Sequence, residues 1–191
     1  SLTSLLNPVI RDNYGNGYVV KNGLVDLTYS SSFVTAVINH GRVSTNGNYA
    51  CHLVVGAGDT DLQLLANAEL SPVKIVRNDA DVQVVAHPAS DAVTAVVYNA
   101  SVPVNYGWLY SLNIPGIIMT KEQGNEIEIA ITNPDMNRPT ASNISALSSA
   151  AIRHPGTPQY VELTLSGEFQ PVASDAGVTI RTENKQTKMI V

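Results

Sequence analysis

The sequence predicts an all-β protein made of antiparallel strands, and three observations lead to this fold class. Short bursts in which apolar and polar residues alternate with a period of two recur along the chain. Glycine, asparagine, aspartate, serine or proline bounds each burst, and these residues favour turns. Charged residues make up only 14% of the chain, while Val, Thr, Ala, Ser and Asn are abundant, which suits half-buried pleated surfaces better than helices.

The first part of the chain contains a series of these bursts, which we predict to be the strands of an antiparallel meander. We assign residues 1–101 to this first β domain. A chain of 191 residues has room for one large domain or two small ones, and it can bury a core without disulfides or metals. The predicted strands of the first domain are residues 17–20, 24–29, 32–39, 49–55, 61–67, 73–76, 82–86 and 92–98.

The residue pattern changes in NASVPVNYG (99–107), where Pro103 and two asparagines interrupt the apolar alternation. We predict a domain boundary near Val102, followed by a small C-terminal β-sandwich over residues 103–191. EIEIAI (126–131) alternates so regularly that we expect one wet and one dry face. The predicted strands of this domain are residues 108–113, 116–122, 125–133, 159–167, 177–183 and 187–191.

Residues 136–158 break this rhythm, because they are rich in serine, alanine and proline. Within them, NISALSSAAI (143–152) predicts either a short helix capped by Asn143 or part of a long connecting loop. Both alternatives remain open at this stage.

Charge and composition argue against several classes of partner. The net charge of −5 comes from scattered acids, so the chain lacks the basic stripe that nucleic acids or anionic membranes require. No apolar stretch approaches the roughly 20 residues of a membrane-spanning helix. The single cysteine, Cys51, excludes an intrachain disulfide and lies in an alternating segment, where we expect a buried, inert thiol. No cofactor is indicated, and a structural calcium ion is compatible with the composition but has no motif to hold it.

RNDADVQVV (77–85) combines acidic residues and an asparagine between two apolar runs. A calcium loop of the EF-hand type that began at Asn78 would need glycine and glutamate where Gln83 and Ala89 stand. We therefore interpret this segment as the tight turn of a hairpin, stabilised by local aspartate and asparagine hydrogen bonds. His87 ends the second strand of that hairpin and is expected to be a surface histidine.

INHGRVSTNGNYACH (38–52) holds residue types suited to acid and base chemistry on a uronic acid. Arg42 would pair with the carboxylate, and Tyr49 would abstract a proton beside His40 and His52. Structural roles are favoured, because His40 ends a strand before a glycine and because Tyr49 and His52 are three positions apart, which places them on opposite faces of a strand.

Five aromatic residues are candidate carbohydrate contacts, because an aromatic ring can cover the C–H face of a pyranose. Tyr14 and Tyr18 lie in a turn rich in asparagine and glycine. Tyr106, Trp108 and Tyr110 are spaced by two and would share one face of a strand, which is more often a core stripe than a ligand platform.

Several of these segments, taken in order, resemble polysaccharide lyase family 8. They are an HG pair that ends a strand (His40, Gly41), a strand around Tyr49, a VVGAG turn (54–58), the IVRNDADVQVV segment (75–85), and GIIMTKEQGNEIEIAITNPDMN (116–137). The resemblance spans nearly the whole chain, although each motif is loose by itself. The turn lacks the proline that the family tends to have, and Cys51 is a second departure.

The resemblance implies an architecture and a function. Members of this family join an α/α toroid to a large antiparallel supersandwich and a small terminal β-sandwich, and they cleave hyaluronan, chondroitin or xanthan by β-elimination. Residues 1–101 would be the later supersandwich strands and residues 103–191 the terminal domain. The catalytic residues of the family lie on the toroid, so His40, Gly41, Tyr49 and Gln83 are expected to be structural and no catalytic residue is assigned.

The sequence therefore leads to a hypothesis and two alternatives. The chain is expected to be a non-catalytic scaffold and cleft wall of a secreted or periplasmic lyase, with a uronic-acid-containing glycan and the N-terminal toroid of the same parent as its partners. The first alternative is a free-standing carbohydrate-binding or adhesive β-sandwich protein that uses Trp108 and the tyrosines. The second is an autonomous lyase that uses His40, Arg42 and Tyr49.

Overall fold

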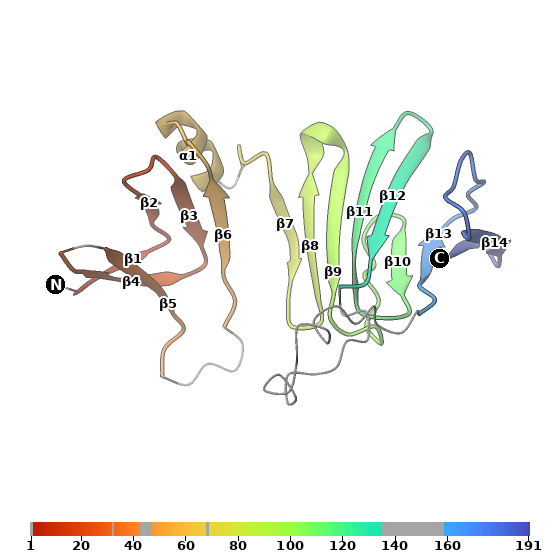
Figure 1. Ribbon diagram of the computed structural model, residues 1–191, viewed down its shortest axis with the longest axis horizontal. Coiled ribbons are helices and arrows are strands. Elements are labelled where there is room, and N and C mark those ends of the chain that lie inside the picture. The colour runs from red at the N-terminus through yellow and green to blue at the C-terminus, as the bar shows by residue number, and fades with distance from the viewer. Residues whose placement is uncertain (1, 32, 43–46, 68, 135–158) are drawn as a thin grey trace, which may run out of the picture. The chain divides into compact units, whose positions relative to one another are not determined.

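A computed structural model describes residues 2–31, 33–42, 47–67, 69–134 and 159–191 (Figure 1). Strands dominate these ranges and their pairing is antiparallel, so the predicted all-β class is confirmed. The chain divides into two compact units, which we call the N-terminal unit (Ser1–Lys74) and the C-terminal unit (Ile75–Val191). Within the described ranges, no helix has the length and apolar character needed to cross a bilayer.

The N-terminal unit contains two three-stranded sheets and one helix. The first sheet has the order β1-β4-β5 and the second the order β2-β3-β6. The elements are β1 (Leu2–Leu6), β2 (Val9–Arg11), β3 (Gly17–Lys21), β4 (Leu24–Tyr29), β5 (Val34–Asn39), β6 (Ala50–Val54) and α1 (Asp59–Ala66).

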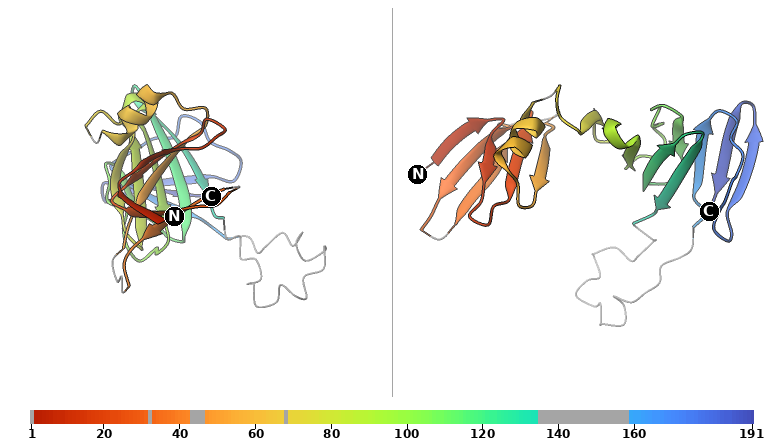
Figure 2. Two further views of the ribbon diagram at one scale, coloured as in Figure 1. Left: turned by 90° about the vertical axis from the view of Figure 1, so that its left-hand side faces the viewer. Right: turned by 90° about the horizontal axis from the view of Figure 1, so that it is seen from above.

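Strand β3 is the centre of this unit, because its successive side chains point to opposite faces. Val19 packs with Leu62 and Leu65 of α1 on one face. Val20 packs with Val25 and Leu27 of β4 on the other face. The second sheet is thus covered by the helix on one side and by the first sheet on the other (Figure 2).

The helix α1 corrects the strand predicted at residues 61–67. Leu62 and Leu65 are both buried while Leu64 is 39% exposed, and this spacing of three fits one face of a helix. The Asp61 carboxylate accepts a hydrogen bond from the backbone N–H of Gly58 at 3.0 Å, which satisfies one amide at the start of the helix. The apolar run was too short for its period alone to distinguish the two structures.

The contact between α1 and β3 depends on the absence of a side chain at Gly17. A Cβ atom built there would lie 2.2 Å from a Leu62 methyl carbon, well inside van der Waals contact. The backbone of β3 can therefore approach the helix closely only where glycine stands.

The C-terminal unit is a sandwich of a five-stranded sheet and a four-stranded sheet. Their orders are β12-β11-β9-β8-β7 and β10-β13-β15-β14. The elements are β7 (Lys74–Asn78), β8 (Val82–His87), the 3₁₀ turn η1 (Pro88–Ser90), β9 (Ala92–Val97), β10 (Leu109–Leu112), β11 (Gly116–Gln123), β12 (Glu126–Thr132), β13 (Glu162–Ser166), β14 (Thr179–Glu183) and β15 (Gln186–Ile190).

A single dry core joins these two sheets. Alternate residues of β8, β9 and β11 enter it from the five-stranded sheet, and residues of β10 and β13 enter it from the other. The isoleucines of β12 are half-buried while its glutamates are exposed, which confirms the wet and dry faces predicted for EIEIAI. The buried core residues are Val82, Val84, Ala95, Val97, Val104, Leu109, Leu112, Ile118, Leu163 and Leu165.

Most predicted strands are present within a few residues of their expected bounds, but β1 and β2 were not predicted. The boundary predicted near Val102 lies inside the C-terminal unit. Strands β9 and β11 pair across it in register, so the residues on both sides share one sheet. The helix or loop predicted at residues 143–152 lies outside the described residues.

Two neighbouring residues of β11 test the core. Ile118 is 0% exposed and Met119 is 56% exposed, because they point to opposite faces of the sheet. We expect Ile118→Ala to lower the free energy of unfolding by about 2–5 kcal/mol, and Met119→Ala by about 0.5 kcal/mol or less. Urea denaturation followed by circular dichroism measures both, and equal losses would contradict this assignment of the faces.

Candidate functional site

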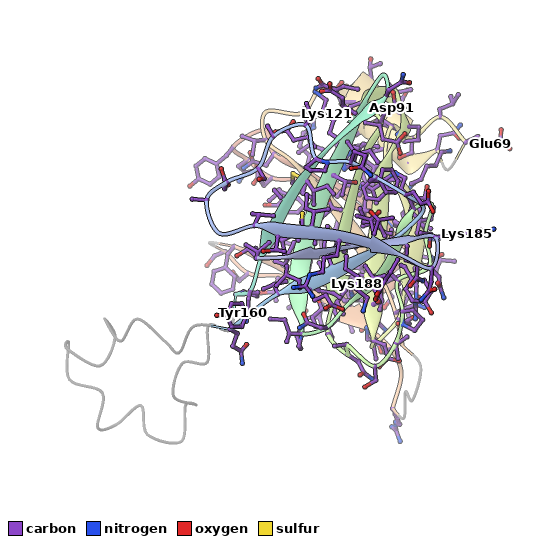
Figure 3. All side chains as sticks on the ribbon, turned by 90° about the vertical axis from the view of Figure 1, so that its right-hand side faces the viewer. Glu69, Asp91, Lys121, Tyr160, Lys185 and Lys188 are labelled. Carbon is purple, nitrogen blue, oxygen red and sulfur yellow. The ribbon has the colours of Figure 1, made fainter. Side chains whose placement is uncertain are left out.

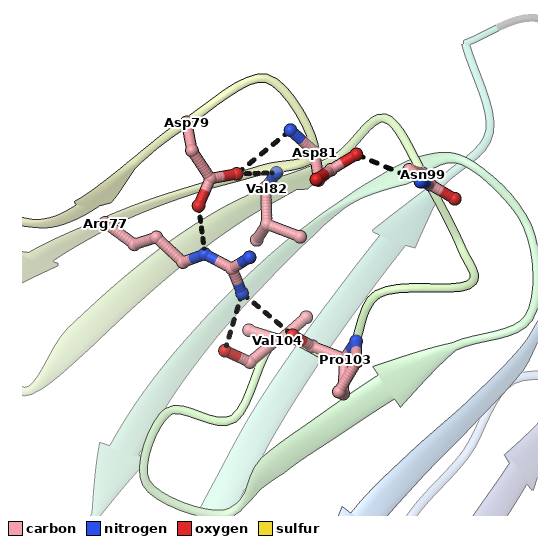
Figure 4. Close-up of polar contacts among 7 residues, drawn as sticks. All are labelled: Arg77, Asp79, Asp81, Val82, Asn99, Pro103 and Val104. Carbon is pink, nitrogen blue, oxygen red and sulfur yellow. Dashed lines mark hydrogen bonds and ion pairs between the residues drawn. The ribbon is translucent and has the colours of Figure 1, made fainter. Parts of the chain in front are cut away.

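The acidic segment at residues 77–82 is a hairpin turn between β7 and β8, as predicted (Figure 4). One carboxylate oxygen of Asp79 accepts hydrogen bonds from the backbone N–H groups of Asp81 at 2.9 Å and Val82 at 2.8 Å. A carboxylate oxygen of Asp81 accepts one from the Asn99 side chain at 2.9 Å. These two aspartates therefore stabilise the turn through their hydrogen bonds. Within the described ranges, no group of three or more His, Cys, Asp or Glu side chains could hold a metal ion.

Arg77 gives this turn a second role that sequence reasoning missed. Its Nε donates to the other oxygen of Asp79 at 2.6 Å. One terminal nitrogen donates to the carbonyl of Pro103 at 2.8 Å and more weakly to that of Val104 at 3.5 Å. The guanidinium thus joins the hairpin to the segment that leads into β10 (Figure 4). No local pattern could reveal a contact between residues so far apart in the sequence.

The hydrogen bond from Arg77 is the largest cause that lowers the pKa of Asp79 below its ordinary value, and the backbone N–H of Val82 adds to it. Both donors favour the charged carboxylate. Asp79 is therefore a structural anion, because these donors outweigh the opposing effect of burial and keep its pKa below its ordinary value, away from the range in which a general acid or base works.

Tyr14 and Tyr18 lie in the hairpin between β2 and β3, and Asp12 organises this turn. One of its carboxylate oxygens accepts from the backbone N–H groups of Tyr14 and Asn16, both at 2.8 Å. The other accepts from the Asn16 side chain at 2.8 Å and from the Tyr18 hydroxyl at 3.3 Å. The side-chain bond from Asn16 is the largest cause that lowers the pKa of Asp12. Tyr18 is half-buried, whereas Tyr14 is 91% exposed.

Tyr106 and Trp108 do not form the predicted stripe on one strand, because they belong to a tight turn before β10. Tyr106 and Leu109 exchange backbone hydrogen bonds at 3.1 and 3.0 Å, and Gly107 between them has a φ of +56°. Both aromatic side chains pack on the core of the unit. Tyr110 lies within β10, at an irregularity in its pairing with β13, and is 38% exposed.

The indole of Trp108 is fixed by two contacts. Its Nε1 donates to a Glu122 carboxylate oxygen at 2.7 Å, and its ring lies edge-on to Phe169 with centroids 6.2 Å apart. Because Trp108 packs against the core and its N–H is bonded, it serves as a part of the sandwich.

The rings of His40 and Tyr49 lie 5.8 Å apart and are tilted by 41°. His52 lies on β6 opposite Val19. Arg42 is exposed. The structure therefore brings His40 and Tyr49 together, and it does so at the surface.

Cys51 is exposed, so the expectation of a buried thiol was wrong. It lies on β6, an edge strand of its sheet, and the core around Val20 does not extend over it. Partial burial raises the pKa of the thiol, which keeps it protonated and weakly nucleophilic at neutral pH.

The outer face of the four-stranded sheet carries Lys188, whose ammonium lies 3.3 Å from Glu162 and 3.7 Å from Glu183 (Figure 3). Two carboxylates thus accompany this cation. Lys188 therefore does not form a positively charged patch that could bind an anionic polymer.

Residues 74–142 match the sequence profile described as polysaccharide lyase family 8, C-terminal beta-sandwich domain. This region belongs to polysaccharide lyase family 8. The match begins at β7, which agrees closely with the start of the C-terminal unit. The family resemblance that the order of motifs predicted is thereby confirmed.

The relatives that this chain matches are much longer proteins. It is 20% identical over 197 aligned residues to the chondroitin sulfate ABC endolyase of Proteus vulgaris, and the alignment covers 93% of this chain and 18% of that protein. The xanthan lyase of Paenibacillus superposes with a TM-score of 0.57 at 13% identity, over 92% of this chain and 16% of that one. The chondroitin AC lyase of Streptomyces coelicolor A3, solved with chondroitin sulphate, superposes with a TM-score of 0.56 at 14% identity, over 97% and 25%.

These superpositions establish a shared fold for nearly the whole chain. The chain spans about a quarter or less of the length of these relatives.

The Arg77 contact can be tested with lysine. Lysine keeps the charge but cannot reach Asp79 and the Pro103 carbonyl at once. We expect Arg77→Lys to lower the free energy of unfolding by about 1–3 kcal/mol, because it leaves a partly buried carbonyl without its donor. Arg181→Lys on β14 is the matched control, since Arg181 is exposed, and it should change stability by about 0.5 kcal/mol or less. Equal effects of the two changes in urea denaturation would contradict the role of Arg77.

The lowered pKa of Asp79 predicts a direction for acid sensitivity. Its folded-state pKa lies below the unfolded value, so its stabilising effect is complete above the ordinary aspartate pKa and disappears as the pH falls through the folded value. Asp79→Asn should therefore destabilise the chain at neutral pH and lose stability less steeply below the ordinary aspartate pKa of about 4. Urea denaturation across that range measures the slope, and parallel curves for the two proteins would count against the prediction.

Proposed function

We propose that this chain is the β-rich C-terminal part of a longer polysaccharide lyase that degrades uronic-acid-containing glycans of the hyaluronan or chondroitin type by β-elimination. In that enzyme it acts as a scaffold and a wall of the cleft, and it supplies no catalytic residue. The parent works outside the cytoplasm, as a secreted or periplasmic enzyme. The observation that carries the proposal is the alignment of nearly the whole chain with only about a fifth of a chondroitin lyase.

The surface of the β1-β4-β5 sheet supports a role as part of a larger assembly. By register, Leu6, Leu24 and Val37 share one face, and Val25 and Leu27 share the other. Only the second face carries buried residues, whereas Leu6 is 73% exposed and Val37 is 54% exposed. The exposed face also carries Asp26, which accepts hydrogen bonds from the Ser4 and Asn39 side chains, so the face is mixed. We infer that the remaining part of the longer enzyme covers its exposed leucine and valine side chains.

The chemistry of β-elimination gives a second argument. The reaction needs a group that neutralises the uronate carboxylate and a base that reaches the C5 proton of the same sugar unit. Of the candidates for these roles, the rings of His40 and Tyr49 lie 5.8 Å apart, but His40, Arg42 and Tyr49 are all exposed and so do not form a water-excluded site for a bound uronate. We therefore assign the chemistry to the remaining part of the enzyme.

An antibody raised against the chain tests this function on the native protein. We expect immunoblots of the source organism to detect a protein several times longer than 191 residues in the medium or periplasm. After purification, that protein should produce a rising ultraviolet absorbance from unsaturated uronate on chondroitin or hyaluronan. The 191-residue chain alone should give a flat trace. A native protein no longer than this chain, or a rising trace from the chain alone, would refute the proposal.

A further inference from the structure

We infer that Asp26, at the centre of the outer face of the β1-β4-β5 sheet, receives an arginine side chain from an apolar segment in the remaining part of the longer enzyme. This inference rests on the proposed function, because that function supplies the longer enzyme. It deepens that function by naming the chemistry of the surface that docks on this sheet and the residue that recognises it.

The outer face of this sheet is the face opposite the buried Val25 and Leu27. Each strand contributes alternate residues to it, and β4 lies in the middle of the sheet. Asp26 lies between Ser4 of β1 and Val37 of β5. It is the only charged member among the described residues that the register places on this face, which are Leu2, Ser4, Leu6, Leu24, Asp26, Thr28, Thr35, Val37 and Asn39.

The composition of this outer face differs from that of a strand face that meets only water. Leu6 and Val37 are each more than half exposed. By contrast, β14 presents Thr179, Arg181 and Glu183 on the outer side of its sheet, and all three are exposed and polar. Large apolar side chains gathered on one exposed face indicate a contact surface.

Asp26 is held in place on this face by two neighbouring strands. The Ser4 hydroxyl donates to one of its carboxylate oxygens at 2.5 Å, and the Asn39 amide donates to the other at 2.6 Å. These two bonds, first that from Ser4, lower the pKa of Asp26 below its ordinary value, so Asp26 is an anion at neutral pH.

The same two bonds leave the carboxylate able to accept more. A carboxylate oxygen accepts about two hydrogen bonds, and the described side-chain contacts of Asp26 use one on each oxygen. One acceptor position on each of two oxygens matches the paired N–H groups of a guanidinium. An arginine that approaches from outside the sheet fits this arrangement.

The charge of Asp26 determines which kind of surface can cover the face. An apolar segment packed on Leu6 and Val37 removes the carboxylate from water, and a buried carboxylate without a cationic partner is strongly unfavourable. The covering segment therefore carries a cation at this point. A second copy of this chain that packed by the same face would bring two such anions to the centre of the contact, where they repel each other.

The size of the face favours a contact within one polypeptide. Three strands about 4.8 Å apart and five residues that each rise about 3.3 Å span roughly 240 Å². Stable complexes of separate chains bury about 800 Å² on each partner. A segment of the same polypeptide needs less area, because its covalent connection removes most of the entropy cost of association. The related endolyase has ample chain for such a segment, since the alignment covers only 18% of it.

Cysteine labelling of the native longer enzyme tests this docking. Thr35→Cys in a Cys51→Ser background places a thiol on the outer face, at a position that is exposed in the 191-residue chain. Mass spectrometry follows maleimide labelling at position 35. We expect the rate to be at least about tenfold lower in the longer enzyme than in the 191-residue chain, because docking covers the thiol.

Variants of Asp26 in the longer enzyme test the cation. Asp26→Lys should bring the rate to within about twofold of that of the 191-residue chain, because two cations repel each other. Asp26→Asn, which keeps the shape but not the charge, should raise the rate by about threefold or more. Asp59→Lys is the matched control, because this aspartate lies on α1 with a side chain that is 89% exposed, and it should leave labelling slow.

Circular dichroism checks that each variant has folded, and Asp26→Asn decides the test if Asp26→Lys does not fold. Equal labelling rates in the longer enzyme and the 191-residue chain would overturn the inference. So would slow labelling that neither Asp26 variant relieves, because the face would then be covered without a cation. Slow labelling of the 191-residue chain together with a dimer in sedimentation would assign the face to a second copy.

The outcomes separate this inference from the proposed function. If the longer enzyme carries out elimination while position 35 is labelled equally fast in both proteins, only the docking at Asp26 falls. If the native protein is no longer than this chain, the proposed function falls and the docking falls with it.

Discussion

The dry interface between the two sheets of the C-terminal unit is the constraint on which this unit depends. Val82, Val84, Ala95 and Ile118 are each 0% exposed and come from three adjacent strands. Because side chains alternate along a strand, burying these residues determines which face of every neighbour meets water. A slip of one residue in any of the three strands would bring polar groups into the core. The burial of these residues determines the pairing register of the strands. The turns, including that of Arg77 and Asp79, only stabilise this register.

The sequence predicted strands correctly where apolar and polar residues alternate over a long stretch. It failed where the apolar run was short or where alternation was absent. EIEIAI predicted β12 and its two faces, because a wet and a dry face leave a regular pattern. The prediction for DLQLLAN was wrong, because its few apolar residues fit both a strand and a helix. The helix is stabilised by the hydrogen bond to Asp61 and by the burial of Leu62, and neither contact can be read from the sequence. The unpredicted β1 carries apolar residues on both faces and so shows little alternation.

The candidate site shows the same division between local and distant contacts. The turn at Asp79 followed from neighbouring residues and was predicted correctly. The hydrogen bonds from Arg77 to the Pro103 carbonyl and from Trp108 to Glu122 join distant segments, so a single sequence contains no signal for them. The spacing of Tyr106, Trp108 and Tyr110 suggested one surface, but the left-handed conformation of Gly107 turns the chain between them.

The self-contained core of the C-terminal unit has a consequence for how proteins with this fold can change over evolutionary time. Its buried core residues all belong to this unit, and the family match begins where the unit begins. A genetic exchange with its junction near Ile75 would transfer a piece that brings its own core. The same exchange made near Val102 would separate β9 from β11 and leave two halves that each expose unpaired backbone, so recombination should favour the first junction.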